Sequence, residues 1–567
     1  MGAESAMTLH ESVSGSISHL LKFQREDGRF EGELSANTFP TCAYALVQMT
    51  LGRPVDDDLV RWFVESQNEK GYWGLDASGD SDSEATLFAE LVLKEIQRTD
   101  YRDDIGAALV KAPKLPLNLW IVKIMYARCG HISWDSLTPP AFLSAVMRVG
   151  EWLMPLLPKS LLSRFKPPDQ YAPPVRLFYS AVFESLFVAE KYTLVPLLLI
   201  METHTQKRMN VVADLANWVL ENRCDDGSWF KVGLITAVSL MSLLDAKAFG
   251  YENPDLESAI QDGDDWLQGL RASSGGCREA INLNVWDTAL SVISLDAVGA
   301  DKYRPQMELA ASWLLENQND DGGWAFSDHP GGKLPSDADD TALATLALLK
   351  AGVDVGNDAV RKSLRWLKEY QAEDGGWGTY VPGAGDVSCV SITSHVIEAC
   401  LAVNELQEED ADSLLGEVNK AVGWLKTAIS SSGCWDDLWL ARNTYGTALA
   451  ITALVKTGHA DCDEVRRGIR WLEQVQNPDG GWGEDMEGNI GPSTVEQTAW
   501  STYALLLADA ENPAAGKGVE YLLGHQNPDG SWPASCVGIY WEVIGGYIDP
   551  TYPSVFSLMA LSRASSS

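Results

Sequence analysis

The sequence predicts an all-α fold of two α/α barrels, and three features of one recurring unit lead to this prediction. In each unit, such as the one from Trp313 to Trp324, an aromatic residue is followed after four residues by Gln or a substitute, and then, in the clear copies, by Asp-Gly-x-Trp. The segment before the Gln has helical periodicity, and the segment after the Trp, such as 341–350, is an apolar helix. The Asp-Gly pair ends the first helix, with Gly in the left-handed conformation. A ring of such helix pairs closes into a barrel.

Copies of this unit occur along most of the chain. Clear copies end at Trp324, Trp377, Trp482 and Trp532, and eroded or degenerate copies end at Phe30, Trp73, Trp229 and Trp435. Because the early copies are degenerate and the late ones regular, we predict one barrel over 21–282 and a second over 283–567. In both barrels we expect the Trp indole to lie on the neighbouring turn and the Gln to hydrogen-bond the ends of adjacent helices.

The composition excludes several classes of protein. The formal net charge of -36 predicts no nucleic-acid partner, because a polyanion repels nucleic acid. The nine Cys form no C-x-x-C pair, which indicates free thiols in a reducing cytoplasm rather than a zinc ribbon or a disulfide scaffold. The longest apolar run, 194–201, is too short to span a bilayer, and 1–15 lacks the basic and apolar blocks of a signal peptide.

One Pro-rich stretch, 139–174, interrupts the repeats. Its segment 151–166 combines Leu and Trp with Lys and Arg, which would suit a peripheral membrane contact. The alternative is a helical connection between the barrels. We therefore predict a cytoplasmic protein, and the alternative is a cytoplasmic protein that binds peripherally to a membrane.

Three acidic residues mark the predicted chemical centre. Asp337, Asp339 and Asp340 lie within four residues where an apolar helix begins. One Asp there would be enough to cap the helix and suit its dipole. Three repel one another, which raises the pKa of at least one. An acid that stays protonated in an apolar pocket can protonate an alkene, which is a very weak base.

The run Asp337-Ala-Asp339-Asp340-Thr-Ala resembles the D-x-D-D-T-A motif of class II terpene cyclases. The Gln/Trp unit resembles the repeat of squalene–hopene and oxidosqualene cyclases, and this resemblance covers nearly the whole chain. It implies an enzyme that cyclises a linear isoprenoid through carbocations, with Asp339 as general acid, Asp337 and Asp340 polarising it, and His395 hydrogen-bonded to it. It also implies that segment 1–20 packs on the C-terminal barrel.

A cyclase must also stabilise cations without removing their protons, and aromatic faces do so. The resemblance implies that six aromatic residues line the substrate: Trp286, Phe326, Trp439, Tyr445, Tyr547 and Tyr552.

The substrate stays open between a squalene-like hydrocarbon, a shorter prenyl diphosphate and a prenylated aromatic. Squalene–hopene cyclases carry glutamates where this chain has Thr41 and Phe88, and a lining Trp and an Arg in the segment of Ala189 and Lys191. Lys191, Arg442 or the basic stretch near Arg164 would be the groups to meet an anionic head. No cofactor is expected, and Mg²⁺ would matter only for a diphosphate.

Three other readings of the sequence are a protein prenyltransferase-like barrel, a carbohydrate-active α/α barrel and a non-enzymatic repeat scaffold. The first needs zinc ligands, for which no convincing trio appears, and the second normally takes its carboxylates from separate segments. The third explains the periodic Gln and Trp but not the acidic tetrapeptide.

Overall fold

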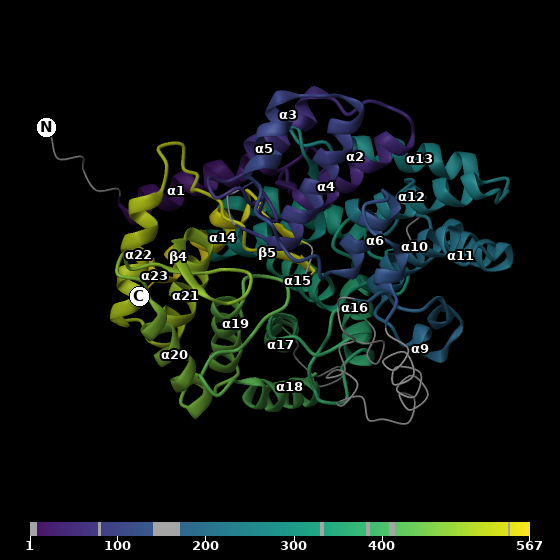
Figure 1. The fold of residues 1–567 in the computed structure, drawn as a ribbon. Coiled ribbons are helices and arrows are strands. Elements are labelled where there is room, and N and C mark those ends of the chain that lie inside the picture. Colours follow the sequence, from purple (N-terminus) through teal and green to yellow (C-terminus); the bar gives the residue numbers. More distant parts are fainter. Residues whose placement is uncertain are drawn as a thin grey trace, which may run out of the picture.

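The computed structural model describes residues 8–77, 81–139, 171–328, 334–380, 386–406, 414–541 and 545–566. These residues are mainly helical, which confirms the all-α prediction (Figure 1). Short antiparallel strands pair as β1 (Ala36–Asn37) with β2 (Cys277–Arg278), β3 (Trp482–Glu484) with β4 (Ile490–Thr494), and β5 (Gly538–Trp541) with β6 (Gly545–Tyr547).

The C-terminal helices form a closed inner ring. Each helix packs against the next, and the last packs against the first: α14 (Asn284–Glu316), α15 (Ala338–Lys350), α17 (Val390–Leu406), α19 (Asn443–Lys456), α21 (Val495–Ala508) and α23 (Tyr552–Ser565). The backbone of α14 is non-helical at Gly299 and Tyr303, so two helices meet there at a kink. Outer helices cover the ring: α1 (Leu9–Leu20), α16 (Asp358–Glu369), α18 (Leu415–Ala428), α20 (Asp463–Val475) and α22 (Pro513–His525).

Burial explains which helices lie inside. Nearly every residue of α15 is buried, whereas α16 buries only the apolar stripe around Val360, Leu364 and Leu367. A helix that is apolar all round must be surrounded by protein, and an amphipathic one can face water. The apolar and amphipathic segments of each repeat therefore become inner and outer helices.

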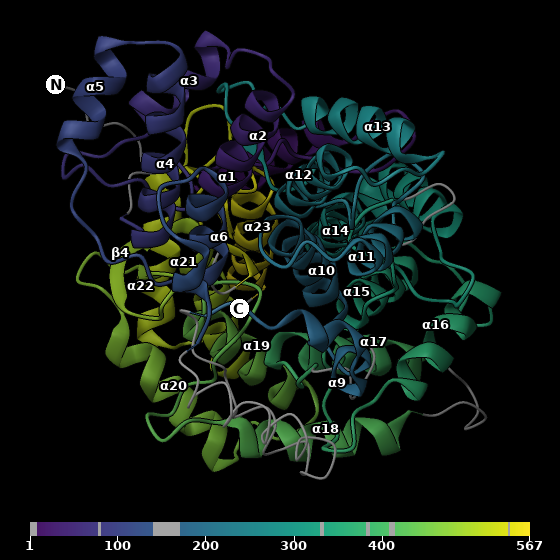
Figure 2. The same cartoon turned by 45° about the vertical axis from the view of Figure 1, so that its right-hand side comes forward.

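The N-terminal helices form a second closed ring, above and to the right of the first in Figure 1 and seen from another side in Figure 2. Its inner helices pack in sequence, the last against the first: α2 (Thr38–Thr50), α4 (Ser83–Thr99), α6 (Trp120–Arg128), α10 (Val188–His204) and α12 (Gly233–Phe249). Helices on its outside are α3 (Asp57–Glu65), α5 (Asp103–Lys111), α11 (Met209–Glu221) and α13 (Leu256–Gly269). Short helical turns join them: Trp134–Leu137, Val175–Tyr179 and α9 (Ala181–Glu184).

The buried apolar side chains form two clusters that match the two rings. The N-terminal cluster runs from Ala36 to Cys277 and gains Ala325, Leu334 and Tyr380 from the second half of the chain. The C-terminal cluster takes residues from 280–561 and also from 17–34. The start of the chain therefore belongs to the C-terminal core, where α1 packs on α23.

In repeats that carry the Gln, its side chain ties its own turn to the next helix, as predicted. Gln476 Nε2 donates to the carbonyls of Gly480 and Ala514, both at 2.8 Å. The last repeat closes the ring through the N-terminus, because Gln526 Nε2 donates to the Ser12 carbonyl in α1 at 3.0 Å. Hydrogen bonds of one kind thus link successive helix pairs.

The repeat Trp and Gly differ in detail from the prediction. The indole bonds its own helix rather than the neighbouring turn: Trp482 Nε1 donates to the Leu472 carbonyl, ten residues earlier, at 2.8 Å. Gly480 has a positive φ of 90°, as predicted, but α20 has already ended at Val475. The glycine therefore shapes the turn that follows the helix rather than its cap.

We expect Gln476→Ala to lower the free energy of unfolding by about 1–3 kcal/mol, because two partly buried carbonyls lose their donor. Thermal unfolding followed by circular dichroism would measure the change. Gln474→Ala is the matched control, since Gln474 is exposed on α20 two residues before Gln476. Equal shifts in Tm for the two variants would contradict a structural role of the repeat Gln.

No helix in the described part of the chain is both long and apolar enough to cross a membrane. Segment 151–166, which we considered as either a peripheral membrane contact or a helical connection, lies outside the described residues.

Candidate active site

A largely apolar cavity lies between the two clusters, with an empty volume of about 970 Å³ that includes space open to solvent. The N-terminal barrel contributes Phe187, Ala189, Thr193, Phe230, Val232 and Ile235 to its lining. The rest of the lining comes from the link between the barrels and from the C-terminal barrel: Glu279, Leu283, Trp286, Phe326, Asp337, Asp339, Asp340, Thr379, Tyr380, Trp439, Leu440, Ile539 and Tyr547.

The three predicted aspartates line this cavity where α15 begins. Asp337 is the N-cap, and its Oδ1 accepts a hydrogen bond from the Asp340 N–H at 2.8 Å. The Asp337 N–H donates to the carbonyl of the repeat residue Trp324 at 2.9 Å, so the preceding repeat turn fixes where the helix starts. Asp339 and Asp340 follow in the first turn, and all three side chains are buried.

His395 on α17 contacts the middle aspartate. Its Nδ1 lies 2.6 Å from Oδ1 of Asp339, and both side chains are buried. Burial alone lowers the pKa of the imidazole, but the Asp339 carboxyl beside it more than offsets this, so the net pKa is raised. Through this contact the Nδ1–H of His395 can donate a hydrogen bond to Asp339 Oδ1.

The outer two aspartates are held in their neutral form. Burial raises the pKa of Asp337 to about 8, although the hydrogen bond from Asp340 opposes this. Burial, together with the charges of Asp337 and Asp339, raises the pKa of Asp340 well above its usual range. Oδ1 of Asp340 has no hydrogen-bond partner among the described residues. The site is thus a cluster of proton-bearing carboxyls on an apolar wall.

Of the six predicted aromatic residues, Trp286, Phe326, Trp439 and Tyr547 line the cavity. Tyr445 and Tyr552 are fully buried behind this lining. The Tyr445 ring lies 6.5 Å from the His395 ring, and the Tyr552 hydroxyl is 2.9 Å from that of Tyr547. These two tyrosines support the lining rather than form it.

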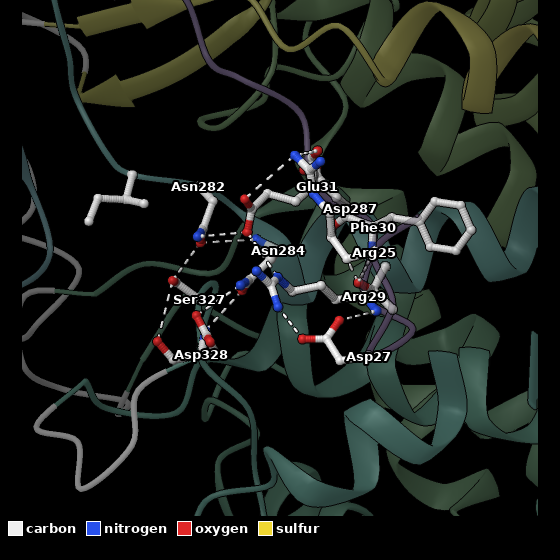
Figure 3. A network of polar contacts seen from close by, with 12 residues as sticks. Arg25, Asp27, Arg29, Phe30, Glu31, Asn282, Asn284, Asp287, Ser327 and Asp328 are labelled. Atoms are coloured by element: carbon white, nitrogen blue, oxygen red, sulfur yellow. Dashed lines mark hydrogen bonds and ion pairs between the residues drawn. The ribbon is translucent and has the colours of Figure 1, made fainter. Parts of the chain in front are cut away.

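A polar network fixes the segments that carry Trp286 and Phe326 (Figure 3). Asn284 Nδ2 donates to Asp328 Oδ1 at 2.8 Å, and the Asp328 N–H donates back to Asn284 Oδ1 at 2.9 Å. Asn282 Nδ2 donates to Glu31 Oε2 at 3.1 Å, which brings in the N-terminal segment. The start of α14 and the loop after Phe326 are therefore held together.

Several lining residues were not predicted, and a pattern in the repeats would have found some of them. Aromatic residues one to four positions after a repeat tryptophan line the cavity: Phe230, Phe326, Tyr380 and Trp439. The chain after that tryptophan leads toward the next inner helix, so these positions reach the cavity. Glu279 has no such pattern, since it lies in the link between the barrels.

The basic residues considered for an anionic head lie away from the lining. The Lys191 amino group bonds the Glu184 carbonyl at 3.1 Å, and Arg442 pairs with Asp436 at 3.0 Å. Arg164 lies outside the described residues. Thr41 and Phe88 are buried in the N-terminal cluster region rather than in the cavity wall. Within the described ranges, no three His, Cys, Asp or Glu side chains are grouped as metal ligands would be.

Two family models match this chain. The model of the squalene–hopene cyclase C-terminal domain matches residues 278–385 and 381–566, and that of the prenyltransferase α/α toroid domain matches 3–112. The squalene–hopene cyclase of Alicyclobacillus acidocaldarius is 27% identical, over 83% of this chain and 92% of that protein. Dammaradiene synthase of Dryopteris crassirhizoma is 26% identical, over 88% and 84% of the two chains.

A solved structure shares the fold over almost its full length. The ent-copalyl diphosphate synthase of Streptomyces platensis covers 98% of this chain and 99% of its own, with a TM-score of 0.62 and 20% identity. The toroid match and this fold confirm the predicted α/α architecture. The chain belongs to the squalene–hopene cyclase family and is a class II terpene cyclase.

Proposed function

We propose that this cyclase starts its reaction by proton transfer from Asp339 to the terminal alkene of a linear isoprenoid. The observation that carries the proposal is the 2.6 Å contact between Asp339 Oδ1 and His395 Nδ1 at the wall of an apolar cavity. With Oδ1 engaged by His395, the proton is carried on the other oxygen, Oδ2. A hydrogen bond donated by the imidazole to Oδ1 stabilises the carboxylate that remains after transfer.

The other carboxyls assist the acid. Neutral Asp337 and Asp340 flank Asp339 without adding charge, and their dipoles polarise its O–H bond. When the proton leaves Asp339, the alkene π electrons form the new C–H bond and a carbocation remains. Neighbouring double bonds then attack in turn to close rings, and the last cation loses a proton or takes up water.

The cation is stabilised by ring faces that cannot act as bases. Trp286, Phe326 and Trp439 line the cavity beside the acid, and each face that meets a cation contributes about 0.5–2 kcal/mol. Such faces lower the energy of each carbocation intermediate, and they do not remove a proton from it.

The lining also bears on the substrate. Its ionisable groups are Asp337, Asp339, Asp340 and Glu279 together with two tyrosines, all of which are neutral or anionic. An anionic diphosphate would meet no cationic side chain in this described lining, and the carboxylate left on Asp339 after proton transfer would repel it. We therefore favour an uncharged isoprenoid, squalene-like or a prenylated aromatic, over a prenyl diphosphate.

Cyclisation in D₂O tests this proposal. The protein would be incubated with squalene, a geranylgeranylated hydroquinone, farnesyl diphosphate and geranylgeranyl diphosphate, with and without Mg²⁺, and products would be read by mass spectrometry. Because Asp339 exchanges its proton with solvent, the cyclic product should carry one non-exchangeable deuterium. A cyclic product without deuterium would exclude initiation by a protein acid, and conversion of the diphosphates alone would overturn the substrate preference.

A further inference from the structure

A second buried carboxyl, distinct from the aspartate motif, faces the cavity. Glu279 follows strand β2 and is only 2% exposed. Its backbone carbonyl accepts a hydrogen bond from the Gly233 N–H, the first residue of α12, at 2.5 Å. Its side chain lines the cavity, and Oε2 has no hydrogen-bond partner within the described ranges.

An unpartnered buried carboxyl oxygen costs about 1–3 kcal/mol, and buried polar groups in folded proteins almost always find a partner. No side chain of the described cavity lining pairs with Glu279 Oε2, and most of that lining is apolar. Burial raises the pKa of Glu279 to about 8, although a hydrogen bond from the Leu234 N–H opposes this. At neutral pH the group is therefore mostly a neutral carboxylic acid, able both to donate and to accept.

We propose that Glu279 binds an oxygen atom of the substrate, an uncharged hydroxyl or carbonyl such as the phenol of a prenylated aromatic. Glu279 is held against the first turn of α12 in the N-terminal barrel, and Asp339 lies in the first turn of α15 in the C-terminal barrel. A substrate that reaches both barrels places its alkene at Asp339 and its oxygenated end at Glu279. This inference rests on the proposed function for the alkene end only.

The alternatives are less consistent with the site. A pure hydrocarbon leaves Oε2 unpartnered, and a diphosphate places several negative charges beside a carboxyl. A neutral carboxylic acid is also a poor base for removing the last proton of the cascade. An uncharged oxygen satisfies the carboxyl at no electrostatic penalty, and a buried polar group of this kind discriminates against analogues that lack its partner.

Binding measured with a matched ligand pair tests the inference. The ligands are geranylgeraniol and the hydrocarbon of the same length without the hydroxyl, titrated by quenching of tryptophan fluorescence in the Asp339→Asn background, where turnover is expected to be strongly slowed. Adding Glu279→Leu should raise the Kd for geranylgeraniol by about tenfold to a hundredfold and leave the Kd for the hydrocarbon unchanged. Glu279→Gln should keep most of the affinity, because an amide also donates and accepts.

Each result decides the question. Unchanged geranylgeraniol binding in Glu279→Leu would overturn the inference, and so would an equal loss for both ligands, which would indicate a damaged cavity. In the Asp339 wild-type background, products with a shifted double bond and an unchanged Kd would assign Glu279 as the terminating base instead. If the Asp339→Asn protein still cyclises, the proposed acid is wrong, yet the Kd comparison between the two ligands keeps its meaning.

Discussion

Replacing Asp339 with Asn is expected to lower the cyclisation rate by about 10²–10⁴-fold, the range that a positioned general acid contributes. The amide has nearly the shape of the carboxyl and can still accept from His395 at Oδ1, so binding and folding should persist. It has no proton acidic enough for an alkene. Single-turnover rates measured with whichever substrate the wild type converts, together with the ligand Kd, would separate chemistry from binding.

The matched control is Asp358→Asn, which makes the same chemical change at a surface carboxyl of α16 with 88% exposure. It should turn over at the wild-type rate. Asp339→Glu keeps the acid but moves it by one methylene, so an intermediate rate is expected. Wild-type turnover by Asp339→Asn would refute Asp339 as the proton donor.

His395→Ala is expected to slow the chemical step by about tenfold to a hundredfold, the equivalent of one charge-assisted buried hydrogen bond. Without the imidazole, the Asp339 carboxylate left by proton transfer loses a hydrogen-bond donor and is less stable. The change should fall on kcat and spare KM, because His395 contacts the acid and lies behind the lining. Steady-state kinetics on the wild type and the variant would show the split.

His395→Asn serves as the second variant, since its amide can donate to Asp339 without a charge. A rate between those of the wild type and His395→Ala would separate the hydrogen bond from the positive charge. If His395→Ala raises KM and leaves kcat unchanged, the histidine contributes to substrate binding and does not assist proton transfer from Asp339.

The sequence predicts this fold well where a residue contacts groups that are close to it in the chain. The repeat Gln bonds a carbonyl of its own turn, the Gly provides the positive φ of that turn, and the Trp bonds the preceding helix, so their spacing reports a helix pair directly. The three aspartates likewise mark the start of α15, because a cap must stand at the first turn of the helix it caps.

Residues whose partners lie far away in the chain escaped prediction. Glu279 reaches the cavity because the link between the barrels passes the start of α12. No local sequence pattern predicts this contact. Tyr380 comes from a C-terminal repeat yet belongs to the N-terminal core. The direction of the Trp indole was also wrong in the prediction, since its partner ten residues back depends on how the turn folds over its own helix.

The packing of α1 on α23 dictates an order of events during synthesis. Residues 36–277 can complete their core while translation continues, but Ile17 and Leu20 bury themselves only against helices made much later. At about 5–20 residues per second, the ribosome needs roughly half a minute or longer to reach α23. During that time the buried face of α1 is without its partner, so α1 should dock only when the C-terminal barrel closes.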